Sequence, residues 1–167
     1  ITRFFTTAWC NVSCARKARQ LQLCPATSAQ HSATYQGGAA EISVFCAGPA
    51  EAATQIRRAL AMGADRGVLL KGDFPFGDAA VAAPLAGALK AWGPDLVLFG
   101  KQAIDDDALQ VPAFVAQALD IPLVSVVTRL EVKDGKALAH RQIEGGHEVV
   151  EVALPAAISC QKGLNVP

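Results

Sequence analysis

The chain has 167 residues, which is enough for one ordinary domain and too few for two large ones. Apolar residues make up 51% of it and charged residues 18%, and 15 Lys and Arg balance 15 Asp and Glu, so the formal net charge is zero. This composition excludes a basic nucleic-acid binder and an acidic disordered tail. The longest uncharged run suited to a buried segment, 79–89, is far shorter than the roughly 20 residues of a membrane-spanning helix, so we expect no membrane insertion.

Residues 1–40 differ in composition from the rest of the chain. They contain no Asp or Glu, carry positive charges at Arg3, Arg16, Lys17 and Arg19, and are rich in Ser, Thr and Ala. Such a composition is typical of a mitochondrial transit segment, and an unrelated or variable N-terminus is the alternative. We therefore treat 1–40 as an anomalous segment without an assigned role and 41–167 as the folded domain.

From Glu41 onward, short apolar runs alternate with segments of helical periodicity. The predicted strands are 41–46, 68–70 and 95–99. Between them, a first helix with apolar residues at helical spacing ends at Gly63, and a second covers 79–92 with Pro84 in its first turn. Strands that are continuously apolar and separated by helices indicate a parallel sheet covered on both faces.

After Asp120 the pattern is typical of hairpins. Residues 124–132 and 137–143 read as strands joined by an Asp134-Gly135 turn, and a second turn at Gly145-Gly146 leads into a strand at 148–154. A last short strand covers 156–160. The sequence thus predicts a βαβαβα unit with an antiparallel appendage.

The segment after the third predicted strand is the best candidate for a ligand site, because open parallel sheets bind ligands at the carboxyl ends of their strands. Gly100 allows close approach of the backbone, and Lys101 and Gln102 can donate hydrogen bonds. A helix beginning within 107–112 would direct its free amides to the same place, which suits a phosphate. Of the carboxylates in 105–107, some must cap that helix or bind ribose hydroxyls.

Each feature also has a simpler interpretation. A glycine at a strand end followed by polar residues is often only a turn, and an acidic triplet is usually a helix cap with a solvated face. A Mg²⁺ site from 105–107 is disfavoured because successive residues cannot all face one ion. Cys10, Cys14, Cys24 and His31 match no zinc spacing, and the five cysteines, an odd number, indicate thiols in a reducing compartment.

Catalytic patterns are absent from the sequence. It contains no Walker phosphate loop, no spaced Gly-x-Gly-x-x-Gly fingerprint and no nucleophile elbow. His31, His140 and His147 read as surface histidines. We expect neither proton-transfer nor covalent catalysis.

Four motifs, in this order, resemble the β subunit of electron-transfer flavoprotein. They are Ala59-Leu-Ala-Met-Gly-Ala-Asp-Arg-Gly-Val-Leu-Leu70, Asp95-Leu-Val-Leu-Phe-Gly-Lys-Gln-Ala-Ile-Asp-Asp-Asp107, Ile143-Glu-Gly-Gly-His-Glu-Val-Val150 and Leu154-Pro-Ala-Ala157. The resemblance covers 41–167. The Gly-Lys-Gln-Ala-Ile-Asp-Asp-Asp string is the most specific part of it.

The resemblance implies a Rossmann-like, three-layer α/β/α domain with a mainly parallel sheet and an antiparallel hairpin appendage. It implies pairing with a larger α subunit, which holds most of a shared FAD, while the β subunit binds AMP or, in electron-bifurcating relatives, a second FAD. The implied nucleotide contacts are Ala47, Gly100, Lys101, Gln102, Ala103, Ile104, Asp105, Asp106, Asp107, Ala108, Leu109, Gln110 and Val111.

The implied function is electron transfer without substrate chemistry of its own. Such a heterodimer carries electrons from acyl-CoA dehydrogenases and other flavin dehydrogenases, in fatty acid oxidation, to a quinone reductase or another acceptor. It works in the bacterial cytoplasm or the mitochondrial matrix.

Two other classes of adenine-nucleotide-binding protein are alternatives to this interpretation. One is a stand-alone stress-type binding module, against which the appendage argues. The other is an ATP pyrophosphatase, whose Ser-Gly-Gly-x-Asp-Ser loop is replaced here by Cys46-Ala47-Gly48-Pro49.

The chain departs from the family pattern at several positions. After the acidic triplet the AMP-binding form continues Asn-Gln-Thr-Gly and the bifurcating form Ala-Gln-Val-Gly, whereas this chain has Leu109-Gln110-Val111-Pro112. Val111 is shared with the bifurcating form, and Pro112 lacks an N–H that could bind phosphate. The family's first strand is not recognisable in 1–36, Val166 replaces a Glu, and the chain stops before the dehydrogenase-docking loop and the C-terminal arm.

Overall fold

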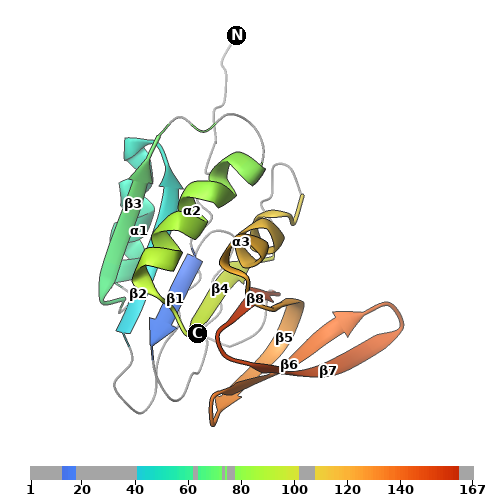
Figure 1. The fold of residues 1–167 in the computed structure, drawn as a ribbon. Helices are drawn as coiled ribbons and strands as arrows, with labels where there is room; N and C mark the ends of the chain where they lie inside the picture. The colour runs from blue at the N-terminus through green and yellow to red at the C-terminus, as the bar shows by residue number, and fades with distance from the viewer. Residues whose placement is uncertain are drawn as a thin grey trace.

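The computed structural model describes residues 13–17, 41–61, 64–72, 74, 78–101 and 108–161. Within this part of the chain, eight strands form one mixed sheet in the order β3-β2-β1-β4-β8-β5-β6-β7 (Figure 1). The strands are β1 (Ser13–Lys17), β2 (Glu41–Gly48), β3 (Arg66–Lys71), β4 (Leu96–Gly100), β5 (Leu123–Lys133), β6 (Lys136–Ile143), β7 (Gly146–Ala153) and β8 (Ala156–Cys160).

The body of the sheet is largely parallel, as expected. β2 pairs with β3 in parallel, and β8 pairs in parallel with both β4 and β5. The last strand therefore does not belong to the appendage, because it returns to the body between β4 and β5. β1, which the sequence analysis did not predict, lies between β2 and β4 and runs antiparallel to both.

Two helices cover one face of this sheet, α2 (Asp78–Trp92) and α3 (Val111–Leu119). The buried face of α2 consists of Val81, Ala82, Leu85, Ala86 and Leu89, whose successive gaps of one and three residues are those of one side of a helix. They form a core cluster with side chains of β2, β4 and α3. Both helices end in a left-handed residue, Gly93 after α2 and Asp120 after α3, the usual C-terminal cap.

The opposite face is covered by two different elements. The short 3-10 turn η1 (Ala50–Ala52) and α1 (Ala53–Ala61) follow β2, and Ile56 of α1 lies where a Cβ on Gly67 of β3 would point. Over β4 and β8, the cover comes instead from the hairpin strands, whose inner residues join Leu96, Leu98 and Ile158 in a second core cluster. The three-layer α/β/α arrangement is thus confirmed, with a hairpin as part of the third layer.

The hairpin strands leave the sheet at an irregularity in β5. Its pairing with β8 shifts between Val124 and Val127, and Val126 has a φ of 58°, which is rare for a β-branched residue. Residues 125 and 126 of β5 lie opposite the single residue Ser159 of β8. Because this one extra residue resets the alternation, Val124 and Val127 both face the second core cluster. Beyond this point the Asp134-Gly135 turn joins β5 to β6 with positive φ at both residues, as the Asp-Gly signal predicted.

Pro84 corrects one expectation. The sequence analysis placed it in the first turn of its helix, but α2 begins at Asp78 and holds Pro84 in its interior. The apolar face of α2 begins at Val81, so burial of that face outweighs the lost hydrogen bond to the Ala80 carbonyl. The expected helix end at Gly63 lies outside the described residues.

Two further observations concern the cysteines and membranes. Cys46 is disulfide-bonded, whereas thiols without disulfides were expected, and Cys160 is a buried thiol outside any disulfide. Among the described helices, none has the length and apolar character needed to span a membrane.

Candidate functional site

The carboxyl ends of β2 and β4 lie at the same edge of the sheet with β1 between them. Phe45 and Leu98 are opposite the successive β1 residues Ser13 and Cys14. Ala47 and Gly100 each follow two residues later, so they lie at nearly the same height. Two strand spacings separate them, which is about 10 Å. This carboxyl edge is where the sequence analysis expected a ligand.

The predicted site residues differ in what they can offer a ligand. Ala47 and Val111 are buried in the core cluster, so only their backbone can reach a ligand. Gly100 ends β4 and is half-buried like Lys101 and Ala108, whereas Leu109 and Gln110 are exposed. The remaining predicted residues lie outside the described part of the chain: Gln102, Ala103, Ile104, Asp105, Asp106 and Asp107.

α3 begins at this edge, within the range predicted for its start. Gln110 is its N-cap residue and makes no side-chain capping hydrogen bond, and its first turn has no acidic residue. A first turn without a carboxylate favours an anion at the positive end of the helix dipole. Pro112 lies in this first turn and is buried, so the amides of Val111 and Ala113 are the N–H groups that the turn retains.

The two residues before α3 add a second anion-binding feature. Leu109 has a φ of 56° and Gln110 is right-handed, with φ −91° and ψ −29°. Successive residues of opposite handedness turn consecutive backbone amides toward one concavity, which suits an anion. We call the amides of Leu109, Gln110 and Val111 the amide nest. The sequence analysis missed it because Leu rarely adopts a left-handed conformation.

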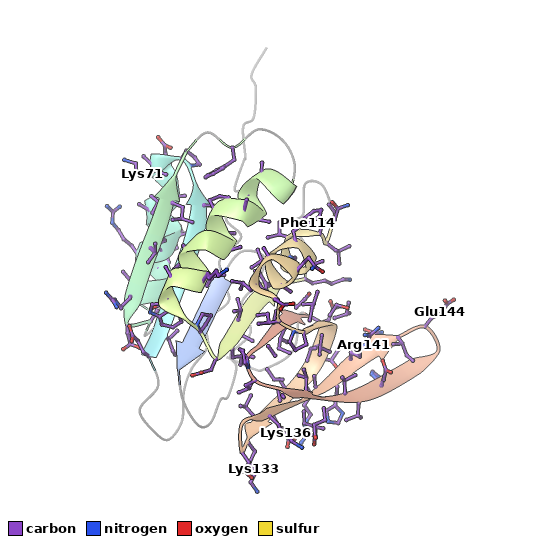
Figure 2. The ribbon with its side chains drawn as sticks, viewed as in Figure 1. Lys71, Phe114, Lys133, Lys136, Arg141 and Glu144 are labelled. Atoms are coloured by element: carbon purple, nitrogen blue, oxygen red, sulfur yellow. The ribbon has the colours of Figure 1, made fainter. Side chains whose placement is uncertain are left out.

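The end of β3 also meets this edge, which the sequence analysis did not include. Lys71 is the register partner of Gly48, and the Gly72 N–H donates to the Gly48 carbonyl at 3.2 Å. Gly48 is buried and is followed by Pro49 and η1. Figure 2 shows Lys71 at the end of β3, on the upper side of the view. The sequence alone could have suggested Lys71 as a site residue, because it follows the predicted strand 68–70 and directly precedes Gly72.

The charges of the described residues favour an anion at the carboxyl edge. The four ion pairs of this part of the chain are Arg66–Glu41, Arg129–Glu131, Lys136–Glu151 and Arg141–Glu148. Lys71 and Lys101 take part in none of them. In the hairpin, the hydrogen bond and the negative charge of Glu151 raise the pKa of Lys136 above its ordinary value. The cations of the hairpin are therefore largely neutralised locally.

The described residues of this edge form no cluster of metal-binding side chains. Within the described ranges, no group of three or more His, Cys, Asp or Glu side chains could hold a metal ion. Lysines, backbone amides and small residues at strand ends are suited to binding a phosphate-bearing ligand.

The chain is similar to several known proteins of one family. The family model of the electron transfer flavoprotein domain matches residues 18–167. The electron transfer flavoprotein subunit beta of Syntrophomonas wolfei is 46% identical over 132 residues, covering 79% of this chain and 52% of that protein. The caffeyl-CoA reductase-Etf complex subunit CarD of Acetobacterium woodii is 47% identical over 131 residues, covering 76% of this chain and 50% of that protein.

Similar proteins also occur in eukaryotes. The electron transfer flavoprotein subunit beta of Dictyostelium discoideum is 36% identical over 129 residues, covering 77% of this chain and 52% of that protein. The chain spans about half the length of the curated relatives it matches. The resemblance seen in the sequence motifs is thus confirmed. The chain belongs to the electron transfer flavoprotein family, and the relatives that it matches are named as β subunits.

Proposed function

We propose that the chain acts as the β subunit of a heterodimeric electron-transfer flavoprotein and binds an adenine nucleotide at the carboxyl edge of its sheet. The nucleotide is AMP or a second FAD, and the electron-carrying FAD is shared with the α subunit. The protein is an electron carrier in this proposal, without substrate chemistry of its own. Its relatives named as β subunits support the pairing with an α subunit.

The observation that carries the proposal is the convergence of three separate chain segments at one edge. The end of β2 contributes Ala47 and Gly48, the end of β4 contributes Gly100 and Lys101, and the amide nest lies at the start of α3. The end of β2 is distant in the sequence from the other two segments, which residues 102–108 join. All three contain residues expected from the family resemblance, and the left-handed conformation of Leu109, which was not expected, adds the geometry of an anion-binding nest.

The donors present fit a nucleotide phosphate. The amide nest supplies N–H groups, Lys101 supplies a positive charge, and the small residues Ala47, Gly48 and Gly100 leave room at the strand ends. Val111 is buried and has no hydroxyl, unlike the Thr of the AMP-binding form, and Pro112 has no N–H to donate. The phosphate therefore depends mainly on the nest and on Lys101. A bound FAD would supply redox chemistry, and a bound AMP would be structural.

The partners follow from the family. We propose that the heterodimer accepts electrons from acyl-CoA or other flavin dehydrogenases and delivers them to a quinone reductase or another acceptor. One relative is named as a subunit of a caffeyl-CoA reductase complex, so a CoA-thioester enzyme is a suitable first partner to test. The compartment would be the cytoplasm in a bacterium or the mitochondrial matrix in a eukaryote.

Co-expression with an electron-transfer flavoprotein α subunit tests the proposal. The purified complex is denatured, and the released nucleotides are identified and counted by mass spectrometry. We expect one FAD per heterodimer together with one AMP, or two FAD. A complex that forms without AMP or a second FAD would contradict the carboxyl-edge site, and a chain that forms no complex but binds ATP alone would support a stand-alone module instead.

A further inference from the structure

Two large apolar side chains are exposed at the start of α3. Leu109 is 41% exposed and Phe114 is 43% exposed. With Gln110 as the N-cap residue, Leu109 occupies the position before the cap and Phe114 the fourth position of the helix. A hydrophobic residue before the cap often packs on one at the fourth helical position, an arrangement called a hydrophobic staple that fixes the angle at which the chain enters the helix.

Leu109 needs such a contact because its backbone conformation is unfavourable. Its φ of 56° lies in the left-handed region, which side chains other than Gly, Asn and Asp seldom adopt. The Phe114 N–H donates to the Gln110 carbonyl at 3.0 Å. Phe114, labelled in Figure 2, thus makes the first hydrogen bond of α3 and also carries the apolar side chain at the staple position relative to Leu109.

We infer that Leu109 and Phe114 are positioning residues of the proposed nucleotide site, acting as a staple that holds the amide nest and Gln110 in their binding geometry. The inference rests on the proposed function. It assigns to two exposed apolar residues a role in affinity without direct contact with the phosphate. In this inference the side chain of Leu109 affects nucleotide affinity through its apolar contact, separately from the effect of its left-handed backbone.

Substitutions at Leu109 separate these two reasons. Asn tolerates the left-handed conformation but cannot form the apolar contact, whereas Met keeps the apolar contact. We expect Leu109→Asn to weaken binding about three- to tenfold, part of the value of one hydrogen bond to a charged group, and Leu109→Met to bind like the parent. Phe114→Ala should cause a similar loss, and the double variant L109N/F114A should bind no more weakly than either single variant.

The measurement is calorimetric titration of the nucleotide-depleted heterodimer with AMP and with FAD, with melting temperatures recorded in parallel. Val149→Ala is the matched control, since Val149 is 55% exposed and lies in the hairpin. It should leave nucleotide affinity unchanged. Phe114→Leu should recover most of the affinity that Phe114→Ala loses, although both shorten the side chain.

The outcomes distinguish this inference from the proposed function. If the parent heterodimer binds neither AMP nor FAD at this edge, the proposed function fails and the staple has no role in binding. If the parent binds nucleotide and Leu109→Asn binds equally well or better, the backbone conformation alone matters and the staple inference is wrong. An equal loss of affinity in Val149→Ala would also contradict it, because the effect would then not be local.

Discussion

Asp65 and Ile42 are joined by two hydrogen bonds where β2 and β3 begin. The Ile42 N–H donates to Asp65 Oδ2 at 2.7 Å, and the Asp65 N–H donates to the Ile42 carbonyl at 2.9 Å. Asp65 belongs to the Met-Gly-Ala-Asp motif that helped to identify the family. Its carboxylate acts at the amino edge of the sheet, opposite the candidate site, so this part of the motif has a structural role.

Replacing Asp65 by Ala should lower the free energy of unfolding by about 1–2 kcal/mol, because the Ile42 N–H loses a charged acceptor. Asp95→Ala is the control, since Asp95 directly precedes β4 as Asp65 precedes β3 and its carboxylate makes no hydrogen bond or ion pair in the described part of the chain. Urea denaturation measures both. Equal stability losses in the two variants would show that the Asp65 carboxylate contributes nothing specific.

Gly67 is a second motif residue whose identity has a structural explanation. A Cβ at this position would collide with Ile56 Cγ2, so Gly67→Ala should force α1 away from β3 and cost about 1–3 kcal/mol. Gly87→Ala is the matched control, because a Cβ on Gly87 of α2 meets no atom within 4 Å. This change should stabilise the helix by about 0.5–1 kcal/mol. Thermal melts showing the same sign for both variants would contradict this packing.

Pro84 lies inside α2 and gives a third prediction. Pro84→Ala restores an N–H that can donate to the Ala80 carbonyl and should raise stability by up to about 3 kcal/mol, less the apolar contacts of the half-buried ring. The increase in melting temperature should appear without any change in nucleotide affinity, since the first core cluster is retained. A destabilised variant would mean that packing of the proline ring outweighs the missing hydrogen bond.

The predictable part of the fold comes from strong local patterns. The apolar runs form strands and helices because they become buried. The backbone geometry at Asp134-Gly135 follows from the turn type, and that at Gly93 follows from helix capping. β1 could not be predicted in this way, because Ser13–Lys17 has no apolar run and its pairing depends on strands far along the chain. Pro84 was misplaced because the local rule for proline competes with burial of a whole helix face, which a single residue does not reveal.

The sequence predicted the strand ends and the helix start of the candidate site, but not the backbone conformation between them. Gly100 and Lys101 follow an unmistakable apolar strand, and Ala47 follows another, so their convergence at one edge follows from parallel pairing. The amide nest depends on Leu109 adopting a conformation that its side chain disfavours, which sequence patterns do not indicate. Lys71 lies at the candidate site because β3 pairs with β2 in a register that places it opposite Gly48. That register becomes known only with the structure.

Pro112 gives a prediction for binding. Pro112→Ala returns an amide to the first turn of α3 and should tighten binding of AMP to the heterodimer by about tenfold, since a hydrogen bond to a charged group contributes about 1.5–3 kcal/mol. Helix stability should change little, because Pro is well tolerated in the first turn. Calorimetric titration measures the affinity. Binding that is unchanged or weaker in the variant would place the phosphate away from this helix start.

The most direct measurement is photolabelling of the heterodimer with 8-azido-AMP, followed by peptide mapping by mass spectrometry. The site at the carboxyl edge predicts labels on the peptides that contain the end of β2, the end of β4 or the segment from Gly100 to Val111. An excess of AMP should suppress them. Suppressible labelling confined to β5, β6 and β7, with none on these peptides, would contradict the placement of the nucleotide at the carboxyl edge.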